Sequence, residues 1–111
     1  MAIALLSATP SFAESDKTGI DFLRECEGRQ EKVGELGVIT CASYLMGFLD
    51  AYRVLSLGLL ENWRTICLPK EGVQAEQAML VVTKWLRENP HELHHSIRVS
   101  ILIALKKAFS C

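Results

Sequence analysis

The sequence predicts an all-α protein, a small bundle of about four helices around a central helix, stapled by two disulfides. Apolar residues recur at helical spacing in several segments, and no alternating apolar–polar run of strand length occurs. The chain also contains four cysteines. Its 111 residues allow one domain, and half of them are hydrophobic, which is enough for a core.

The first residues have the pattern of a secretory signal peptide. Met1–Leu6 is apolar, and Ser11-Phe12-Ala13 places small residues three and one before a cleavage point after Ala13. The usual positively charged start is missing, so either the start Met is assigned too late or the apolar run acts without it. We expect residues 1–13 to be a signal peptide whose true beginning is open, and 14–111 to be one exported helical domain. The alternative is an N-terminal segment of a cytosolic protein.

The first helix of the exported domain is predicted to begin after Thr18. Thr18 can cap the helix, and Asp21 stands at the third helical position, which is close to a capping box. Gly28 ends the segment, and residues 27–35 are polar with two glycines, which is typical of an exposed loop.

The central helix is predicted to run from about residue 36 to residue 60. Apolar side chains lie on nearly every side of it, so we expect it to be enclosed, with Gly47 letting another backbone approach closely. Residues 36–49 form an uncharged stretch of fourteen, which Asp50 and Arg53 then interrupt. A membrane span needs roughly 20 apolar residues, so we expect a core helix and no membrane insertion of the mature chain.

Two further helices are predicted from apolar stripes. The third covers about Gln74 to Glu88 and is stopped by Asn89-Pro90, where Asn89 can also cap the next helical segment. Its stripe consists of Ala75, Ala78, Met79, Val82, Trp85 and Leu86. The last helix runs from about His94 to Phe109, and its expected core residues are Ile97, Ile101, Leu102, Leu105, Ala108 and Phe109.

The four cysteines indicate two disulfides in an exported chain. Three pairings are possible, and the sequence alone does not choose among them. Cys26 ends one predicted helix and Cys41 opens the next, so a Cys26–Cys41 bond would staple a short loop, leaving Cys67–Cys111 to close a long one. Such loops would contribute roughly 3 and 4 kcal/mol in the chain-entropy model. Zinc is the rival use of four cysteines, but no C-x-x-C pair occurs.

The remaining motifs argue against an enzyme. A net charge of −1 gives no basic excess for nucleic acid, and neither a G-x-S-x-G motif nor a glycine-rich phosphate loop is present. His91, Glu92 and His95 match the H-E-x-x-H pattern of zinc hydrolases, but Pro90 precedes the motif and no Asp, Glu or His comes after it as a third ligand. We therefore predict no catalytic residues, no metal and no cofactor, and expect the protein to act by binding.

The chain resembles the Rap/Tai immunity proteins, which protect bacteria against peptidoglycan amidase effectors of the type VI secretion system. The resemblance covers roughly Phe22 to Cys111 and rests on the order and spacing of several pieces. These are Cys41-x-x-Tyr44-Leu45-x-Gly47-Phe48-x-Asp50-Ala51, Ile66-Cys67-Leu68-Pro69, a helix with Gln77, Val81, Val82 and Trp85-Leu86, then Asn89-Pro90, and Ala104-Leu105-x-x-Ala108-Phe109-Ser110-Cys111. Ser110 stands where the family usually has proline.

The resemblance implies a helical periplasmic protein, often a homodimer, that blocks the active site of an amidase and so protects the producing cell from self and sibling intoxication. Inhibitors of this kind present a complementary surface, with a protruding loop that fills the cleft. The expected contact residues are Arg87, Asn89, His91 and Glu92 in a turn between two helices, with Trp63 and Arg64 in a connector as the second choice. The competing interpretation is a small periplasmic chaperone of the acid-stress type, which would bind many unfolded clients.

Overall fold

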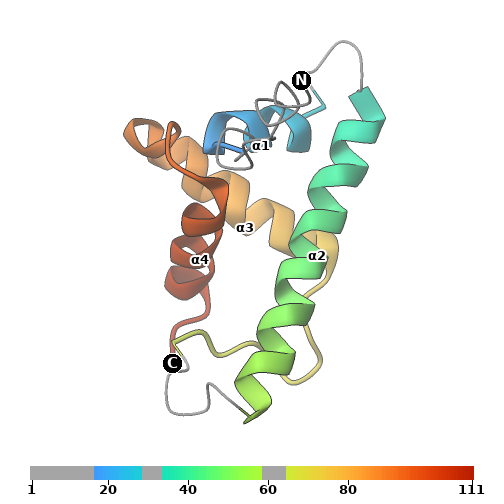
Figure 1. Cartoon of the computed structure of the whole chain (residues 1–111), viewed down its shortest axis with the longest axis vertical. Coiled ribbons are helices and arrows are strands. Elements are labelled where there is room, and N and C mark those ends of the chain that lie inside the picture. The colour runs from blue at the N-terminus through green and yellow to red at the C-terminus, as the bar shows by residue number, and fades with distance from the viewer. Residues whose placement is uncertain (1–16, 29–33, 59–64) are drawn as a thin grey trace, which may run out of the picture.

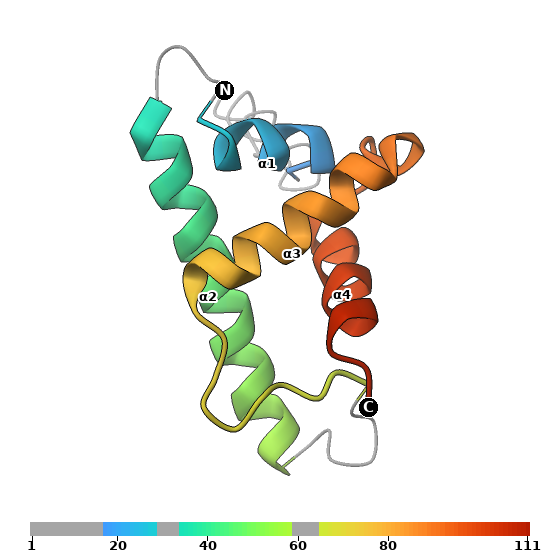
Figure 2. The same ribbon diagram turned by 180° about the vertical axis from the view of Figure 1, so that it is seen from behind.

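The computed structural model describes residues 17–28, 34–58 and 65–111. Within them the predicted all-α fold is confirmed, with α1 (Gly19–Cys26), α2 (Gly34–Gly58), α3 (Ala75–Glu88) and α4 (Ile97–Ala108). A short 3-10 helix, η4 (Pro90–Glu92), lies between α3 and α4. α3 packs against each of the other three helices, and α2 and α4 stand on either side of it (Figures 1 and 2). The expected signal peptide, residues 1–13, lies outside the described residues.

α1 begins with the capping box that the sequence predicts. The Thr18 hydroxyl accepts a hydrogen bond from the Asp21 backbone N–H at 3.3 Å, and the Asp21 carboxylate accepts one from the Thr18 N–H at 3.5 Å. Both bonds satisfy N–H groups that a helix start leaves without a partner. Farther along, the buried Glu25 pairs with Lys17 at 2.6 Å, so its charge is compensated. The helix therefore has a fixed beginning and a fixed direction.

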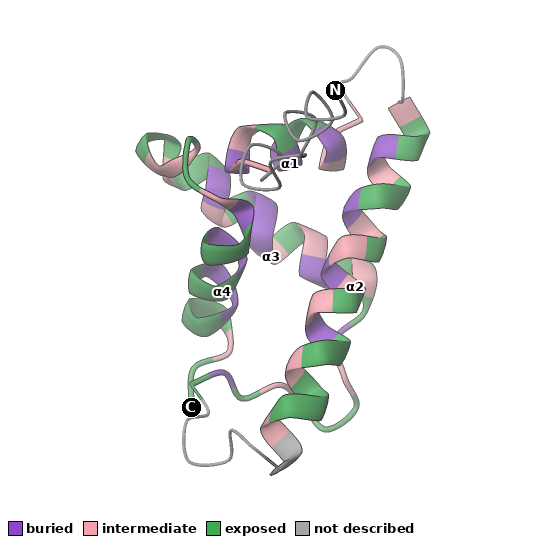
Figure 3. Ribbon diagram, in the orientation of Figure 1, coloured by how far each residue is buried: buried purple, intermediate pink, exposed green. Residues whose placement is uncertain are grey.

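α2 is less buried by the other helices than the sequence predicts. Cys41, Leu45 and Leu49 succeed one another at intervals of one turn and are buried. The other faces of α2 are largely exposed (Figure 3), and the large hydrophobic residues on them are Leu36, Ile39, Val54 and Leu55. The expectation that α2 is enclosed is therefore wrong, because α1 and α3 pack closely against one face only.

The segment Gly34–Ser56 of α2 is long and apolar enough to cross a membrane by length and composition, with a mean hydropathy of 1.3. The fold uses the same helix as a packing surface. Cys41 is bonded to Cys26 of α1, and Leu45 is fully buried among side chains of the other helices. These contacts make α2 part of the folded domain.

Gly47 was expected to let another backbone approach α2 closely, but the close approach occurs at Gly37 instead. A Cβ added at Gly47 would meet no atom within 4 Å, so nothing packs closely there. Gly37 lies near the start of α2, where the helix crosses α1, and a Cβ added there would come within 3.1 Å of the Glu25 carbonyl oxygen. The absence of a side chain at Gly37 is what lets the two helices approach.

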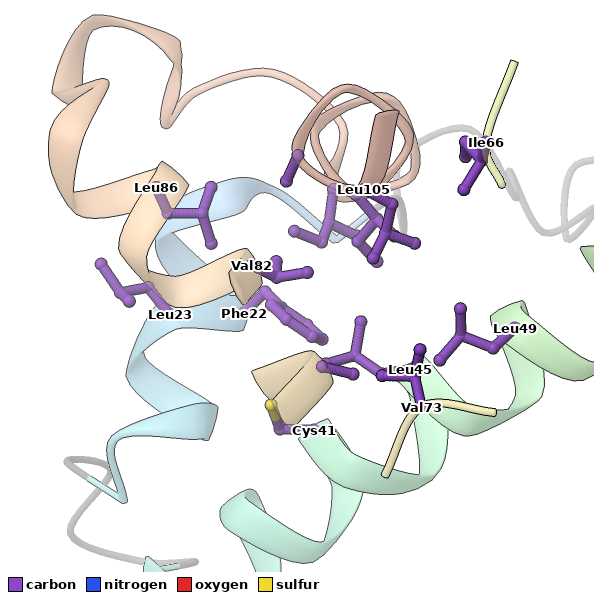
Figure 4. Close-up of a cluster of buried hydrophobic side chains, with 14 residues drawn as sticks. Phe22, Leu23, Cys41, Leu45, Leu49, Ile66, Val73, Val82, Leu86 and Leu105 are labelled. Atoms are coloured by element: carbon purple, nitrogen blue, oxygen red, sulfur yellow. The ribbon is translucent and has the colours of Figure 1, made fainter. Parts of the chain in front are cut away.

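The core collects one face of each helix. Phe22 of α1, Val82 of α3 and Leu105 of α4 converge, with Leu45 of α2 facing them (Figure 4). The predicted stripe of α3 is confirmed, since Ala78, Val82 and Leu86 are buried and Ala75, Met79 and Trp85 are partly so. On α4, the core residues are Ile97, Ile101, Ala104 and Leu105. Leu102 and Ala108, predicted as core residues, are exposed.

Two disulfides join the helices in the pairing that the order of elements favoured. Cys26–Cys41 links the end of α1 to α2, and Cys67–Cys111 links the connection before α3 to the last residue. Beside the second bond, the Cys67 N–H donates to the Phe109 carbonyl at 2.7 Å. The Tyr52 hydroxyl of α2 accepts from the Ile66 N–H and donates to the Ile66 carbonyl, each at 3.1 Å. The C-terminal residues are thereby fastened to the connection, and the connection to α2.

Candidate functional site

The turn that links α3 to α4 protrudes at the end of α3 that lies away from α2 (Figures 1 and 2). Of the four residues that the sequence singles out for partner contact, Arg87 lies in the last turn of α3, and Asn89, His91 and Glu92 follow it in the turn. We refer to this segment as the turn Arg87–Glu92. The second predicted element, Trp63 and Arg64, lies outside the described residues. The turn is therefore the candidate site whose geometry can be described.

Asn89 closes α3 rather than capping the helix after it. Its side-chain amide donates to the Trp85 carbonyl at 2.8 Å, and its backbone N–H donates to the Leu86 carbonyl at 3.2 Å. No side-chain cap forms at η4, although Pro90 occupies its first position as predicted. The last carbonyls of a helix lack intrahelical partners, so these bonds stabilise the end of α3 and set the direction in which the chain leaves it.

Arg87 fastens the same end of α3 to the end of α1. Its Nε lies 2.9 Å and its Nη2 2.7 Å from Oε2 of Glu27. The Glu27 side chain is only 14% exposed, whereas that of Arg87 is 52% exposed. Because Glu27 is largely shielded from water, this charge-assisted contact positions the turn more firmly than a fully exposed pair would.

His91, Glu92 and His95 gather on the outer side of the turn. The Glu92 carboxylate lies between two imidazoles, with Oε1 3.6 Å from Nε2 of His91 and Oε2 3.1 Å from Nε2 of His95. The rings of His94 and His95 lie 4.0 Å apart. The side chains of His91 and His95 are 71% and 52% exposed, so both are accessible to a partner.

This arrangement does not resemble the zinc site that an H-E-x-x-H motif forms on a helix. His91 and Glu92 belong to the three-residue η4, and His95 lies in the turn after it, so the motif is not carried by one α-helix. Among the described residues, no group of three or more His, Cys, Asp or Glu side chains is suited to hold a metal ion. The Glu92 carboxylate instead lies close to one ring nitrogen of each of two histidines, His91 and His95.

The backbone of the turn rests on the first turn of α1. The Gly19 N–H donates to the His95 carbonyl and the Ile20 N–H to the Leu93 carbonyl, both at 3.0 Å. These are N–H groups that the start of α1 would otherwise leave unpaired. A Cβ added at Gly19 would lie 3.3 Å from the Leu93 Cα, so a side chain there would require the Leu93 backbone to shift slightly. In the sequence, this contact between α1 and the turn was indicated only by a glycine, Gly19, directly after the capping Thr18.

The segment 94–96, predicted to open the last helix, belongs to the same anchored turn. Ser96 pairs with Thr18 in an isolated β-bridge, and the Ile97 N–H donates to the Lys17 carbonyl at 2.9 Å. α4 begins only at Ile97 because the backbone before it is engaged with residues 17–19. The protruding turn is thus held at both ends, by side chains at Arg87 and Asn89 and by backbone bonds from residue 93 onward.

Comparison with known proteins gives a match between this chain and one protein family. A family model described as Rap1a immunity proteins matches residues 18–111. The match begins at the capping residue Thr18 and includes all four cysteines and all described helices. No curated protein and no solved structure matches the chain.

Proposed function

Because the chain belongs to the Rap1a immunity protein family, we propose that it binds and inhibits a peptidoglycan amidase effector delivered by a type VI secretion system. Family membership assigns the role of an immunity protein and implies a cognate effector as partner. The family match over residues 18–111 is the observation that carries this proposal. The amidase as target rests on the resemblance to the Rap/Tai proteins.

The proposed place of action is the periplasm, where such an amidase would cut the cell wall. Both disulfides support this, because such bonds form and persist in oxidising compartments. The apolar start with Ser11-Phe12-Ala13 after it supports export with cleavage near Ala13. In that compartment the protein would protect the producing cell from its own effector and from that of its siblings.

The turn Arg87–Glu92 is the proposed element that fills the catalytic cleft of the amidase. Its support is geometric: the turn protrudes, His91 is largely exposed, and both ends of the turn are anchored to α1. A preorganised loop loses little conformational entropy on binding, which favours tight inhibition. In this role Arg87 and Asn89 hold the turn in shape, while His91 and Glu92 face the enzyme.

The test is the affinity of a His91→Ala, Glu92→Ala double variant for candidate amidases, measured by calorimetry together with inhibition of cell-wall hydrolysis. We expect the dissociation constant to rise about tenfold or more, as for residues at the centre of an interface. The matched control is Lys70→Ala with Glu71→Ala, an exposed pair in a different turn. Unchanged affinity of the first variant, with both variants melting like the wild type, would remove the turn from the interface.

A homodimer is proposed for the exposed face of α2. Leu36, Ile39 and Val54 are each more than half exposed, which is unusual for large apolar side chains on one helix of a soluble domain. A second copy would cover this face. Sedimentation analysis of the purified protein should therefore give a dimer. A monomer that suppresses aggregation of unfolded proteins at acid pH would instead favour the chaperone.

A further inference from the structure

A groove of about 280 Å³ lies between α3 and α4 and reaches Glu88, near the start of the turn Arg87–Glu92. Trp85 lines it from α3, and Ala104 and Ala108 line it from α4. The two alanines are four residues apart and so lie on one face of α4, one turn from each other. Because both side chains are small, they leave the partly exposed indole of Trp85 uncovered.

The walls of the groove are basic and aliphatic. Lys84 lines it from α3 and Lys107 from α4. Each lysine comes one helical turn after an exposed aliphatic residue: Leu80, 62% exposed, precedes Lys84, and Ile103, 43% exposed, precedes Lys107. The lining itself contains one ammonium group from each helix and the aliphatic side chain of Val81 on α3.

Basic side chains outnumber acidic ones in the lining of the groove, with Lys84 and Lys107 against Glu88. From Ile97 to Cys111 every charged side chain is basic, and the residues are Arg98, Lys106 and Lys107. Glu88 is the one acidic residue that lines the groove within the described part of the chain. A complementary partner would therefore carry an apolar group for the indole and negative charge for the lysines.

We propose that this groove docks a segment of the effector that presents a bulky apolar side chain beside a carboxylate. The inference rests on the proposed function and adds a second contact to it. Trp is the residue type most often found at energetically dominant interface positions, above all in pockets that exclude water. The apolar side chain would cover Trp85, and the carboxylate would pair with Lys84 or Lys107.

A protein segment fits the groove better than a membrane surface does. The indole lies in a hollow between two helices, which a side chain can enter and a flat bilayer cannot. Glu88 would also oppose the anionic lipids that basic helices bind. In addition, Glu88 is the last residue of α3, so the groove continues into the turn Arg87–Glu92 and one partner can cover both.

Neighbouring lysines on α4 provide a matched test. Lys107 lines the groove, whereas Lys106 is exposed on the same helix and does not. Lys107→Glu and Lys106→Glu change the net charge equally, so general electrostatic attraction is the same in both. We expect Lys107→Glu to raise the dissociation constant for the amidase about tenfold, and Lys106→Glu to leave it near the wild-type value.

A second variant fills the groove without changing charge. Ala108→Leu adds bulk at an exposed position beside Trp85, so it should weaken the complex while the thermal unfolding midpoint stays near that of the wild type. In a Trp63→Phe background, the fluorescence of Trp85 should shift to shorter wavelength on complex formation, because the partner removes water from the indole. An unshifted spectrum in a formed complex would overturn the inference.

The outcomes separate the two proposals. If the wild-type protein binds and inhibits no amidase, the proposed function fails, and the groove loses its partner with it. If the wild type inhibits an amidase but Lys107→Glu and Lys106→Glu bind it equally well, the groove alone is refuted. The last measurement is binding of the protein to vesicles of phosphatidylglycerol and phosphatidylethanolamine. Binding to them that Lys107→Glu abolishes, with amidase affinity unchanged, would assign the groove to a membrane and overturn the inference.

Discussion

The Cys67–Cys111 disulfide gives the most direct test of how this small domain is stabilised. It closes a loop of 44 residues in sequence that contains α3 and α4, and both cysteines are exposed. Replacing both by serine therefore removes the cross-link without opening a cavity or burying a hydroxyl group. In the chain-entropy model, the lost constraint on the unfolded chain costs about 4 kcal/mol.

That cost is a large fraction of the 5–15 kcal/mol typical of a folded domain. With a urea dependence of about 2 kcal/mol per molar, the unfolding midpoint should fall by about 2 M. The Cys67 N–H bond to Phe109 and the contacts of Tyr52 with Ile66 remain, so the native fold of the variant is expected to persist at low urea. Equilibrium unfolding monitored by circular dichroism measures the midpoint.

Reduction supplies the control for this experiment. A reducing agent should destabilise the wild type by more than the double serine variant, because the wild type then loses both bonds and the variant only Cys26–Cys41. The turn Arg87–Glu92 should keep its shape in the serine variant, since it is anchored to α1 and not to the C-terminus. A variant with the same urea midpoint as the oxidised wild type would refute the loop-closure argument.

Three further substitutions test the packing around α2. Tyr52→Phe removes the hydroxyl that hydrogen-bonds both the N–H and the carbonyl of Ile66. The unfolding free energy, measured in a denaturant titration, should therefore fall by about 1–3 kcal/mol. An unchanged value would mean that water replaces the hydroxyl. Gly47→Ala should stabilise the helix by up to about 1 kcal/mol because nothing lies within 4 Å, whereas Gly37→Ala should destabilise because its Cβ meets the Glu25 carbonyl oxygen at 3.1 Å. Equal effects of the two alanines on the melting temperature would contradict the assigned crossing point.

Features that depend on neighbouring residues in the chain were well predicted. The capping box at Thr18 and Asp21 needs only a spacing of three residues, and the stripe of α3 needs only helical periodicity. The disulfide pairing also agreed with the order of elements, because Cys26 ends α1 and Cys41 lies in the N-terminal part of α2, the next helix. The four turn residues of the candidate site were found together because they are consecutive with the Asn89-Pro90 stop.

Features that depend on packing between helices were not predicted. Leu102 is apolar and matches the helical spacing, yet it is exposed because α3 covers the opposite side of α4. Asn89 has the side chain of a helix start, but it bonds the Trp85 carbonyl of the helix before it. The groove over Trp85 had no sequence signature, since small residues at 104 and 108 leave a hollow only when α3 lies opposite them.

The sequence by itself determined the helical class and where helices begin, because caps and periodicity act within one segment or between adjacent ones. The order of its motifs carried the resemblance to immunity proteins. Only the tertiary structure decided which helix faces stay open to a partner. The four helices bury one face each, and whether an apolar residue such as Val54 meets another helix or solvent depends on where the other helices cross α2. The surfaces available for binding are therefore a consequence of packing, which local patterns do not encode.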